Sequence, residues 1–227
     1  MSLKFIQQNY LKYNKGKGFI CGHVDALHAT PPAADVFTDK IVESLIKKTG
    51  CAGIISSVSR NEADLNRSPN GDNDHAIKEY RDAVKKIVEF LNILDDEQNH
   101  ITQPYLHLSF HGMKDTHYGP YGIEIGTVHG QSCSPIIKKW FLETITRKAS
   151  EILPEIEIVF DEKFIGDESI VYHRLGDGID YSGYHHHFHT FQIEISRTIR
   201  SKHRSKIITI FSHMINEFQK NFVNNYS

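Results

Sequence analysis

The sequence predicts an α/β fold in which helices pack on the faces of a β-sheet. Two observations carry this prediction. Short apolar runs rich in β-branched and aromatic residues recur along the chain, and they have the length of strands. Between them lie longer segments whose apolar residues repeat with helical spacing. Such an alternation of strands and helices is typical of an α/β sandwich.

The predicted elements can be placed along the chain. Strands are expected at residues 18–23, 51–60, 105–112, 156–161 and 191–196. Helices are expected at residues 36–49, 75–94, 135–153 and 197–223. Surface loops are expected at residues 66–74 and 173–184, where turn-forming residues cluster. A chain of 227 residues can bury one large core, so we expect a single domain over residues 1–227.

Composition narrows the possible partners. The formal net charge of −2 offers no long-range attraction for nucleic acid or anionic lipid. No run approaches the ~18 apolar residues of a membrane span, and the N-terminal residues lack the apolar stretch of a signal peptide. We therefore expect a cytoplasmic protein with a small partner, binding neither nucleic acid nor membrane.

Histidines stand at the ends of two expected strands. His23 ends the first strand, with Asp25 and His28 close behind it. His111 ends the third strand, and Gly112 after it permits a close turn. Imidazole nitrogen and carboxylate oxygen are the usual non-thiolate ligands of zinc. A hydrogen-bonded histidine at a strand end is the alternative in each case.

Alternation along the strands predicts which polar side chains share a face. His107, Ser109 and His111 lie on one face of their strand, and Glu194 shares a face with Gln192. A carboxylate in so apolar a strand as QIEIS is costly unless it is paired, lies near a metal or works as a base. A structural ion pair is the alternative for Glu194.

The stretch SRNEADLNR, residues 59–67, follows the second expected strand directly. Arg60 and Arg67 carry planar guanidinium groups that can bind a carboxylate through two hydrogen bonds, and Asn66 adds a donor. Asp64 could hold Arg67 or Arg60 in place. A solvated, charged turn is the alternative.

This stretch resembles the SR…DLNR signature of the N-formylglutamate amidohydrolases, whose Asn-Arg pair recurs in the related aspartoacylases and zinc carboxypeptidases. The resemblance continues in the same order through the loop at His23, the SRNEADLNR stretch, the His111-Gly112 pair and the late QIEIS-R. It implies the three-layer α/β/α sandwich of the zinc exopeptidases, with a mixed central sheet. It also implies a zinc-dependent hydrolase that cleaves an amide next to a carboxylate-bearing residue, for example in N-formylglutamate.

The resemblance implies a set of metal ligands. His23 and His111 would hold the zinc ion, and we expect His28 to complete the site, with Asp25 as the alternative. Related enzymes often have a glutamate shortly after the first histidine and an aspartate in the strand before the second. This chain has His28 or Asp25 near the first of these positions and Ser109 at the second.

The resemblance also implies roles in catalysis and substrate binding. Glu194 would be the general base, and Asn66 and Arg67 would hold and position the substrate carboxylate. Further candidate contacts to a small acidic substrate are Arg60, Arg197 and His173. Two other functions fit the same residues, namely a zinc peptidase acting on γ-glutamyl or C-terminal residues and a non-catalytic protein that binds metal or anions.

Overall fold

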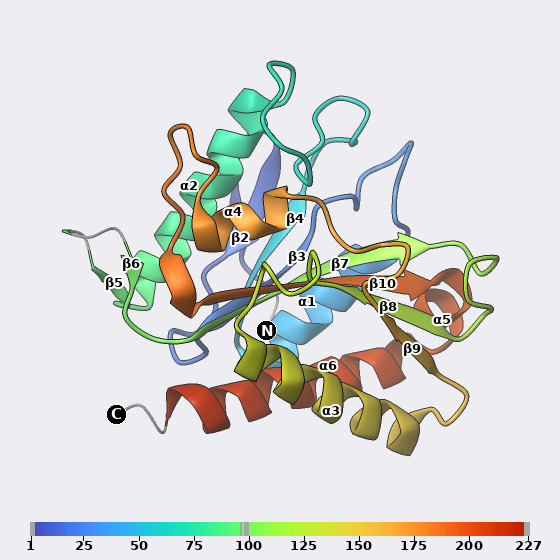
Figure 1. Cartoon of the computed structure of the whole chain (residues 1–227). Coiled ribbons are helices and arrows are strands. Elements are labelled where there is room, and N and C mark those ends of the chain that lie inside the picture. Colours follow the sequence, from blue (N-terminus) through green and yellow to red (C-terminus); the bar gives the residue numbers. More distant parts are fainter. Residues whose placement is uncertain (1–2, 96, 98–99, 225–227) are drawn as a thin grey trace.

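The computed structural model describes residues 3–95, 97 and 100–224 and confirms the predicted three-layer α/β/α fold (Figure 1). The middle layer is a mixed sheet of eight strands. One face is covered by α1 (Thr38–Thr49), α3 (Pro135–Ile152) and α6 (Arg204–Phe218). The other face is covered by α2 (Asp74–Phe90) and α4 (Ser169–Leu175). None of the helices in the described ranges has the length and apolar character needed to cross a membrane.

The sheet has a parallel centre and antiparallel additions. Its strands follow the order β1 (Ile6–Gln7), β2 (Leu11–Asn14), β4 (Ala52–Ser56), β3 (Gly22–Ala26), β7 (Tyr105–Met113), β10 (Phe188–Ser196), β8 (Gly122–Gly126) and β9 (Glu157–Phe160). The four central strands β4, β3, β7 and β10 are parallel, whereas β2 and β8 run antiparallel to them. A separate two-stranded ladder joins β5 (Leu94–Asp95) and β6 (His100–Ile101).

Most of the expected elements are present, with corrected boundaries. The first expected strand is misplaced, because β3 begins at Gly22 and continues to Ala26 instead of ending at residue 23. The last expected helix is interrupted at His203, which separates α5 (Arg197–Lys202) from α6. The short helix α4 extends into the predicted loop 173–184. The elements that were not predicted include the strands β1, β2, β5, β6 and β8 and the helix α4.

The two faces of the central strands differ in polarity, as the alternation in sequence predicts. Phe110 of β7 packs edge-to-face on Phe211 of α6, with ring centroids 5.0 Å apart. His107 faces the opposite layer, where its ring centroid lies 5.8 Å from that of His173 in α4. The apolar face of the sheet therefore packs on α1, α3 and α6, and a row of polar side chains faces α2 and α4.

The order of the central strands creates a crevice at one edge of the sheet. From β3 the chain passes through α1 to β4 on one side, while β7 pairs with β3 on the other side. Ligands of open α/β sheets bind where strand order reverses in this way, beyond the carboxyl ends of the strands. The loop after β3 and the end of β7 meet at this point.

Gly112 serves a different purpose from the predicted turn. Strand β7 continues past it to Met113, and a Cβ atom at residue 112 would lie 2.4 Å from the Arg200 guanidinium carbon. Arg200 is 5% exposed and donates hydrogen bonds to the main-chain oxygens of Ile195, Met113 and Val36. The missing side chain of Gly112 lets Arg200 tie the ends of β7 and β10 to the loop before α1.

Replacing Arg200 with alanine should lower the free energy of unfolding by roughly 3 kcal/mol or more, because three main-chain carbonyls lose a charged donor. Arg197→Ala is the matched control, since Arg197 begins the same helix but is exposed; its effect should stay within about 0.5 kcal/mol. Urea unfolding at neutral pH measures both. Equal stabilities of the two variants would contradict the role assigned to Arg200.

Candidate metal centre and active site

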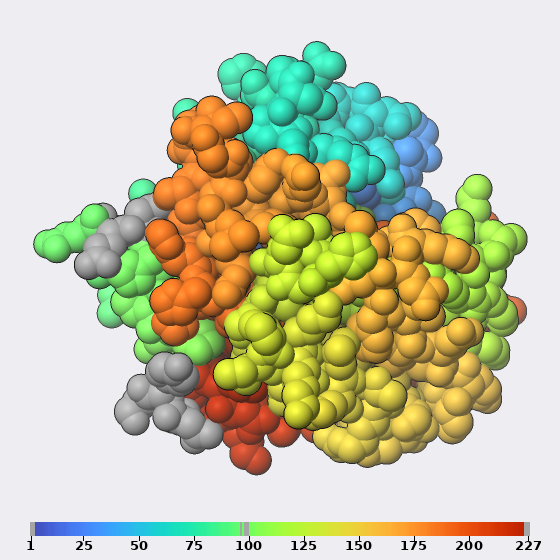
Figure 2. All heavy atoms as spheres, in the orientation of Figure 1, coloured from blue at the N-terminus to red at the C-terminus, as the bar shows by residue number. Residues whose placement is uncertain are grey.

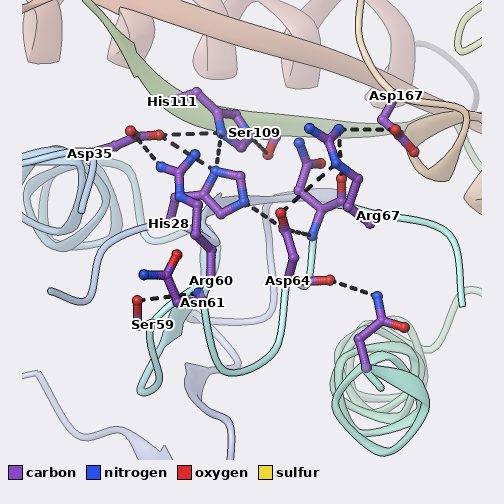
Figure 3. Close-up of polar contacts among 12 residues, drawn as sticks. His28, Asp35, Ser59, Arg60, Asn61, Asp64, Arg67, Ser109, His111 and Asp167 are labelled. Atoms are coloured by element: carbon purple, nitrogen blue, oxygen red, sulfur yellow. Dashed lines mark hydrogen bonds and ion pairs between the residues drawn. The ribbon is translucent and has the colours of Figure 1, made fainter. Parts of the chain in front are cut away.

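Three buried ligand atoms converge at the crevice between β3 and β7 (Figure 3). His28 lies two residues after the end of β3, His111 lies near the end of β7, and Asp35 belongs to the loop that leads to α1. The Nδ1 atoms of the two histidines are 3.1 Å apart, and Oδ2 of Asp35 lies 3.6 Å from His28 Nδ1 and 3.5 Å from His111 Nδ1. In a tetrahedral site with metal–ligand bonds of ~2.0–2.1 Å, neighbouring ligand atoms are about 3.3 Å apart. The three atoms are spaced to hold one metal ion.

The far nitrogens of the two histidines are also held. Nε2 of His28 lies 2.6 Å from Oδ1 of Asp64. Nε2 of His111 lies 3.0 Å from the Ser109 hydroxyl oxygen. A histidine that donates its far N–H to an acceptor keeps a lone pair on the other nitrogen, as metal ligation requires. The main contact of Asp64 is therefore with His28. Asp64 was predicted to hold an arginine in place, but it lies 3.9 Å from Nε of Arg67, so its contact with that arginine is weaker.

Asp35 is fixed from both sides. Nη2 of Arg60 donates to its Oδ1 at 2.6 Å, while Oδ2 faces the two histidines. Burial acts to raise the pKa of Asp35, but its contacts with His111 and His28 and the charge of Arg60 outweigh burial and hold the pKa below its usual range. The carboxylate is thus ionised and suited to a cation.

A second group of potential ligands lies deeper under the sheet and is built differently. His23, Asp25 and His107 are buried side by side. The rings of His23 and His107 are stacked, with an interplanar angle of 9° and centroids 4.1 Å apart. A metal ion must lie near the plane of each imidazole at ~2.0–2.1 Å from nitrogen. No single metal position lies near the planes of both His23 and His107, because these stacked rings are parallel. The rings of His28 and His111 cross at 73° and do allow such a position.

The first group opens into a cavity of about 310 Å³. The cavity is polar, and both charge signs are represented in its lining. Its side chains come from His28, Asp35, Arg60, Asn66, Arg67, His111, Lys163, Phe164, Ile165, Asp167, Gln192 and Glu194. Six residues predicted for the site, on four different segments of chain, are brought together here.

Glu194 lies beside His111 in the register of β10 and β7 and is 7% exposed. Its Oε1 accepts a hydrogen bond of 3.3 Å from Gln192, which in turn accepts one of 3.3 Å from Asn66. Burial raises the pKa of the Glu194 carboxyl to about 7, although the charges of His111 and Arg200 act in the opposite direction. A carboxyl with such a pKa can accept and return a proton near neutral pH.

Arg67 lines the same cavity and is about half exposed. Its Nη1 lies 2.9 Å from Oδ2 of Asp167. In Figure 2 the segment that includes Asp167 (orange) lies against the segment that includes Arg67 (cyan). A hydrogen bond between Ser68 and Tyr172 joins the same two segments. The arginine predicted to bind a carboxylate therefore already has one as its neighbour.

Three predicted site residues lie elsewhere. His23 is inside β3, where it contacts Tyr105 rather than His28 or His111. His173 is buried in α4 and bonds to Tyr181, and burial lowers its pKa to about 3, so it carries no charge for an anion. Arg197 is exposed and does not line the cavity. The structure groups Asp35, instead of His23 or Asp25, with His28 and His111.

Sequence reasoning missed Asp35, Lys163 and Asp167. Asp35 stands seven positions after His28 in the loop PPAAD. Its position between an expected strand and an expected helix is the one feature of the sequence that could have identified it as a ligand. Asp167 and Lys163 reach the site from a segment that is distant in sequence and carries no motif.

Comparisons with known proteins rest on structure alone, because no family model and no curated protein sequence matches the chain. The crystal structure of an N-formylglutamate amidohydrolase from Ralstonia eutropha JMP134 is similar, with a TM-score of 0.64 and 14% identity over 93% of this chain and 97% of that one. A gene product of Agrobacterium tumefaciens has a TM-score of 0.56 and 12% identity over 92% and 94% of the two chains. The structural likeness and the resemblance of the motifs thus lead to the same group of proteins, and the chain has the fold of an N-formylglutamate amidohydrolase.

Proposed function

We propose that this protein is a zinc-dependent hydrolase that cleaves an amide bond in a small carboxylate-bearing substrate, an N-acyl amino acid such as N-formylglutamate. The observation that carries the proposal is the spacing of His28 Nδ1, His111 Nδ1 and Asp35 Oδ2, which fits the edges of a tetrahedral site. The shared fold with an N-formylglutamate amidohydrolase supports the substrate class.

In this proposal His28, His111 and Asp35 are the protein ligands, in place of a set that includes His23. Three ligands leave one position of a tetrahedral ion for water or substrate, as catalytic zinc sites require. Bound zinc would supply Lewis-acid activation of that water and of the scissile carbonyl. Asp64 and Ser109 hold the far nitrogens of the two histidines, so that both rings keep their orientation.

Glu194 is the proposed general base. It lines the cavity next to His111 in the sheet, and its pKa of about 7 suits proton transfer at neutral pH. Its carboxylate takes a proton from the attacking water and delivers it to the leaving amine. The hydrogen bond from Gln192 orients this carboxylate.

Arg67 and Asn66 are proposed to hold the carboxylate of the substrate so that its amide meets the metal and Glu194. Both line the same cavity as the ligands. A substrate carboxylate would exchange with Asp167 on the guanidinium of Arg67, and the exposure of Arg67 makes this exchange accessible. Lys163, also in the lining, adds positive charge for an anionic substrate.

Zinc content, together with single-turnover hydrolysis of a panel of N-acyl glutamates, N-acyl aspartates and γ-glutamyl peptides, tests the proposal. Hydrolysis of an N-acyl amino acid by protein with one zinc per chain is expected. Preference for the peptides would indicate a peptidase, and zinc binding without turnover would indicate a non-catalytic relative.

His28→Ala should weaken zinc binding by more than about a hundredfold, which exceeds the usual cost of losing a residue that merely orients a ligand. His23→Ala is the matched control, since His23 is an equally buried histidine whose ring cannot share a metal with its neighbour His107. It should keep one zinc per chain. Titration against a chromophoric chelator measures both affinities, and loss of zinc from His23→Ala alone would reverse the ligand assignment.

Arg67→Lys should lower kcat/KM on carboxylate-bearing amides by roughly ten- to a thousandfold, because the ammonium keeps the charge but loses the two-pronged hydrogen bond. Zinc content should not change, since Arg67 is not a ligand.

Asp167→Asn provides the complementary variant. It removes the carboxylate that competes for Arg67, so KM should fall while kcat stays similar. If Arg67→Lys leaves kcat/KM unchanged and Asp167→Asn leaves KM unchanged, Arg67 belongs to a structural ion pair and the proposed substrate class has to be dropped.

Glu194→Gln should lower kcat by roughly 10²- to 10⁴-fold while zinc stays bound, because the amide cannot accept the proton.

The same variant should also change how the free energy of unfolding of the metal-free protein depends on pH. Native Glu194, with a pKa of about 7 against an ordinary value of 4.5, binds a proton that the unfolded chain has already released. Raising the pH from 4.5 through 7 therefore costs the native protein roughly 3 kcal/mol of stability through this group.

Urea unfolding of chelator-treated protein at pH 5 and pH 8 checks this sign. The stability of the wild type should fall, relative to that of Glu194→Gln, as the pH rises. A pH dependence shared by both proteins would show that Glu194 is ionised in the native state throughout this range.

A further inference from the structure

We propose that Asp25, which does not touch the candidate metal site, positions His111 through the hydroxyl of Ser109. The inference rests on the proposed function, because it assigns His111 as a ligand. It adds a positioning residue that neither the motifs nor the ligand geometry identifies. Asp25 lies on β3, Ser109 and His111 on β7, and Asp25 and Ser109 are direct partners in the register of the two strands.

The three residues form a continuous chain of hydrogen bonds. Ser109 donates its hydroxyl proton to Oδ1 of Asp25 at 2.6 Å. Nε2 of His111 lies 3.0 Å from the same hydroxyl oxygen. All three side chains are at most 2% exposed, so water does not compete for these contacts. The far side of the His111 ring, Nδ1, is the atom that faces Asp35 and His28.

The direction of the protons follows from simple counting. A serine hydroxyl has one proton, and an ionised carboxylate can only accept. Because that proton goes to Asp25, the hydroxyl oxygen must accept from His111, and Nε2 of His111 must carry a hydrogen. The neutral imidazole then has its lone pair on Nδ1, directed at the other two ligand atoms. Asp25 thus selects the tautomer of His111 that can bind a metal.

Asp25 is itself anchored for this task. Its other oxygen, Oδ2, accepts from Tyr80 of α2 at 2.7 Å and lies 2.8 Å from Nε2 of His107. These contacts fix the carboxylate from the helix layer and from the neighbouring strand. A buried carboxylate held by three partners cannot turn away from Ser109 without leaving a donor unsatisfied.

Asp64 holds the other ligand histidine, His28, by direct contact with its Nε2 atom. Its carboxylate lies 2.6 Å from Nε2 of His28. A carboxylate therefore supports Nε2 of each ligand histidine: Asp64 contacts His28 directly, and Asp25 acts on His111 through a hydroxyl group. The pairing explains why an uncharged serine is sufficient at position 109.

Two variants interrupt the chain of hydrogen bonds at different places. Ser109→Ala removes the hydroxyl but leaves Asp25 bonded to Tyr80 and His107, and Asp25→Asn removes the obligate acceptor. Each should weaken zinc binding by about 10- to 100-fold, the usual cost of losing a partner that orients a metal ligand. The double variant should lose no more than the weaker-binding single variant, because both changes break one series of contacts.

A second measurement follows the tautomer itself. In metal-free wild type, ¹⁵N NMR of the imidazoles should show hydrogen on Nε2 of His111, and in Ser109→Ala a substantial share should move to Nδ1. If the wild type binds no zinc, the proposed metal site fails, but this spectrum still tests the inference. If Asp25→Asn does not fold, Ser109→Ala decides alone.

Tyr80→Phe is the control for a merely structural role. It removes one hydrogen bond from the same carboxylate but leaves the link to Ser109 intact. It should lower the melting temperature while zinc affinity stays within about threefold of wild type. The inference is overturned if Ser109→Ala binds zinc as tightly as wild type with an unchanged His111 tautomer, or if Tyr80→Phe weakens zinc binding as much as Ser109→Ala does.

Discussion

Strands β3 and β7 lie side by side with their carboxyl ends at the same edge of the sheet, and the candidate site depends on this placement. His28 leaves the end of β3 and His111 lies near the end of β7, so the pairing of the two strands brings their Nδ1 atoms to 3.1 Å. The loop from β3 to α1 has to turn back over this edge, and it carries Asp35 to the same point. A strand order in which β3 and β7 were not neighbours would separate His28 from His111, which are distant in sequence.

The same placement creates a polar layer inside the protein. The face of β3, β7 and β10 that meets α2 and α4 carries His23, Asp25, His107 and Ser109, all nearly inaccessible to solvent. Burying a carboxylate costs several kcal/mol unless its acceptor positions are used. Asp25 meets this condition through Tyr80, His107 and Ser109, and the resulting network is rigid because each member needs the others. A rigid support of this kind preorganises the histidine at its rim.

The chemistry of the cavity follows from unequal environments of its carboxyl groups. Asp35 is surrounded by cationic and hydrogen-bonding partners that lower its pKa, which suits a metal ligand. Glu194 is buried with few such partners, so its pKa rises to about 7, which suits a base. Asp167 is partly exposed and paired with Arg67, as the proposed exchange with a substrate carboxylate requires. Three acids in one cavity are thus suited to three different tasks.

The sequence by itself determined the alternation of strands and helices, the polar face of β7 and the SRNEADLNR stretch, because each depends on neighbours a few residues away. It also picked out His111 at a strand end, Glu194 within an apolar strand, and His28 in the loop after the first expected strand. It placed His23 at the strand exit and in the metal site, which is wrong for the strand exit, because the boundary of β3 is set by pairing with β4 and β7 and the strand continues to Ala26. Asp35, Asp167 and the contact of Asp25 with Ser109 depend on how loops fold over the sheet and on strand register, which only the tertiary structure decided.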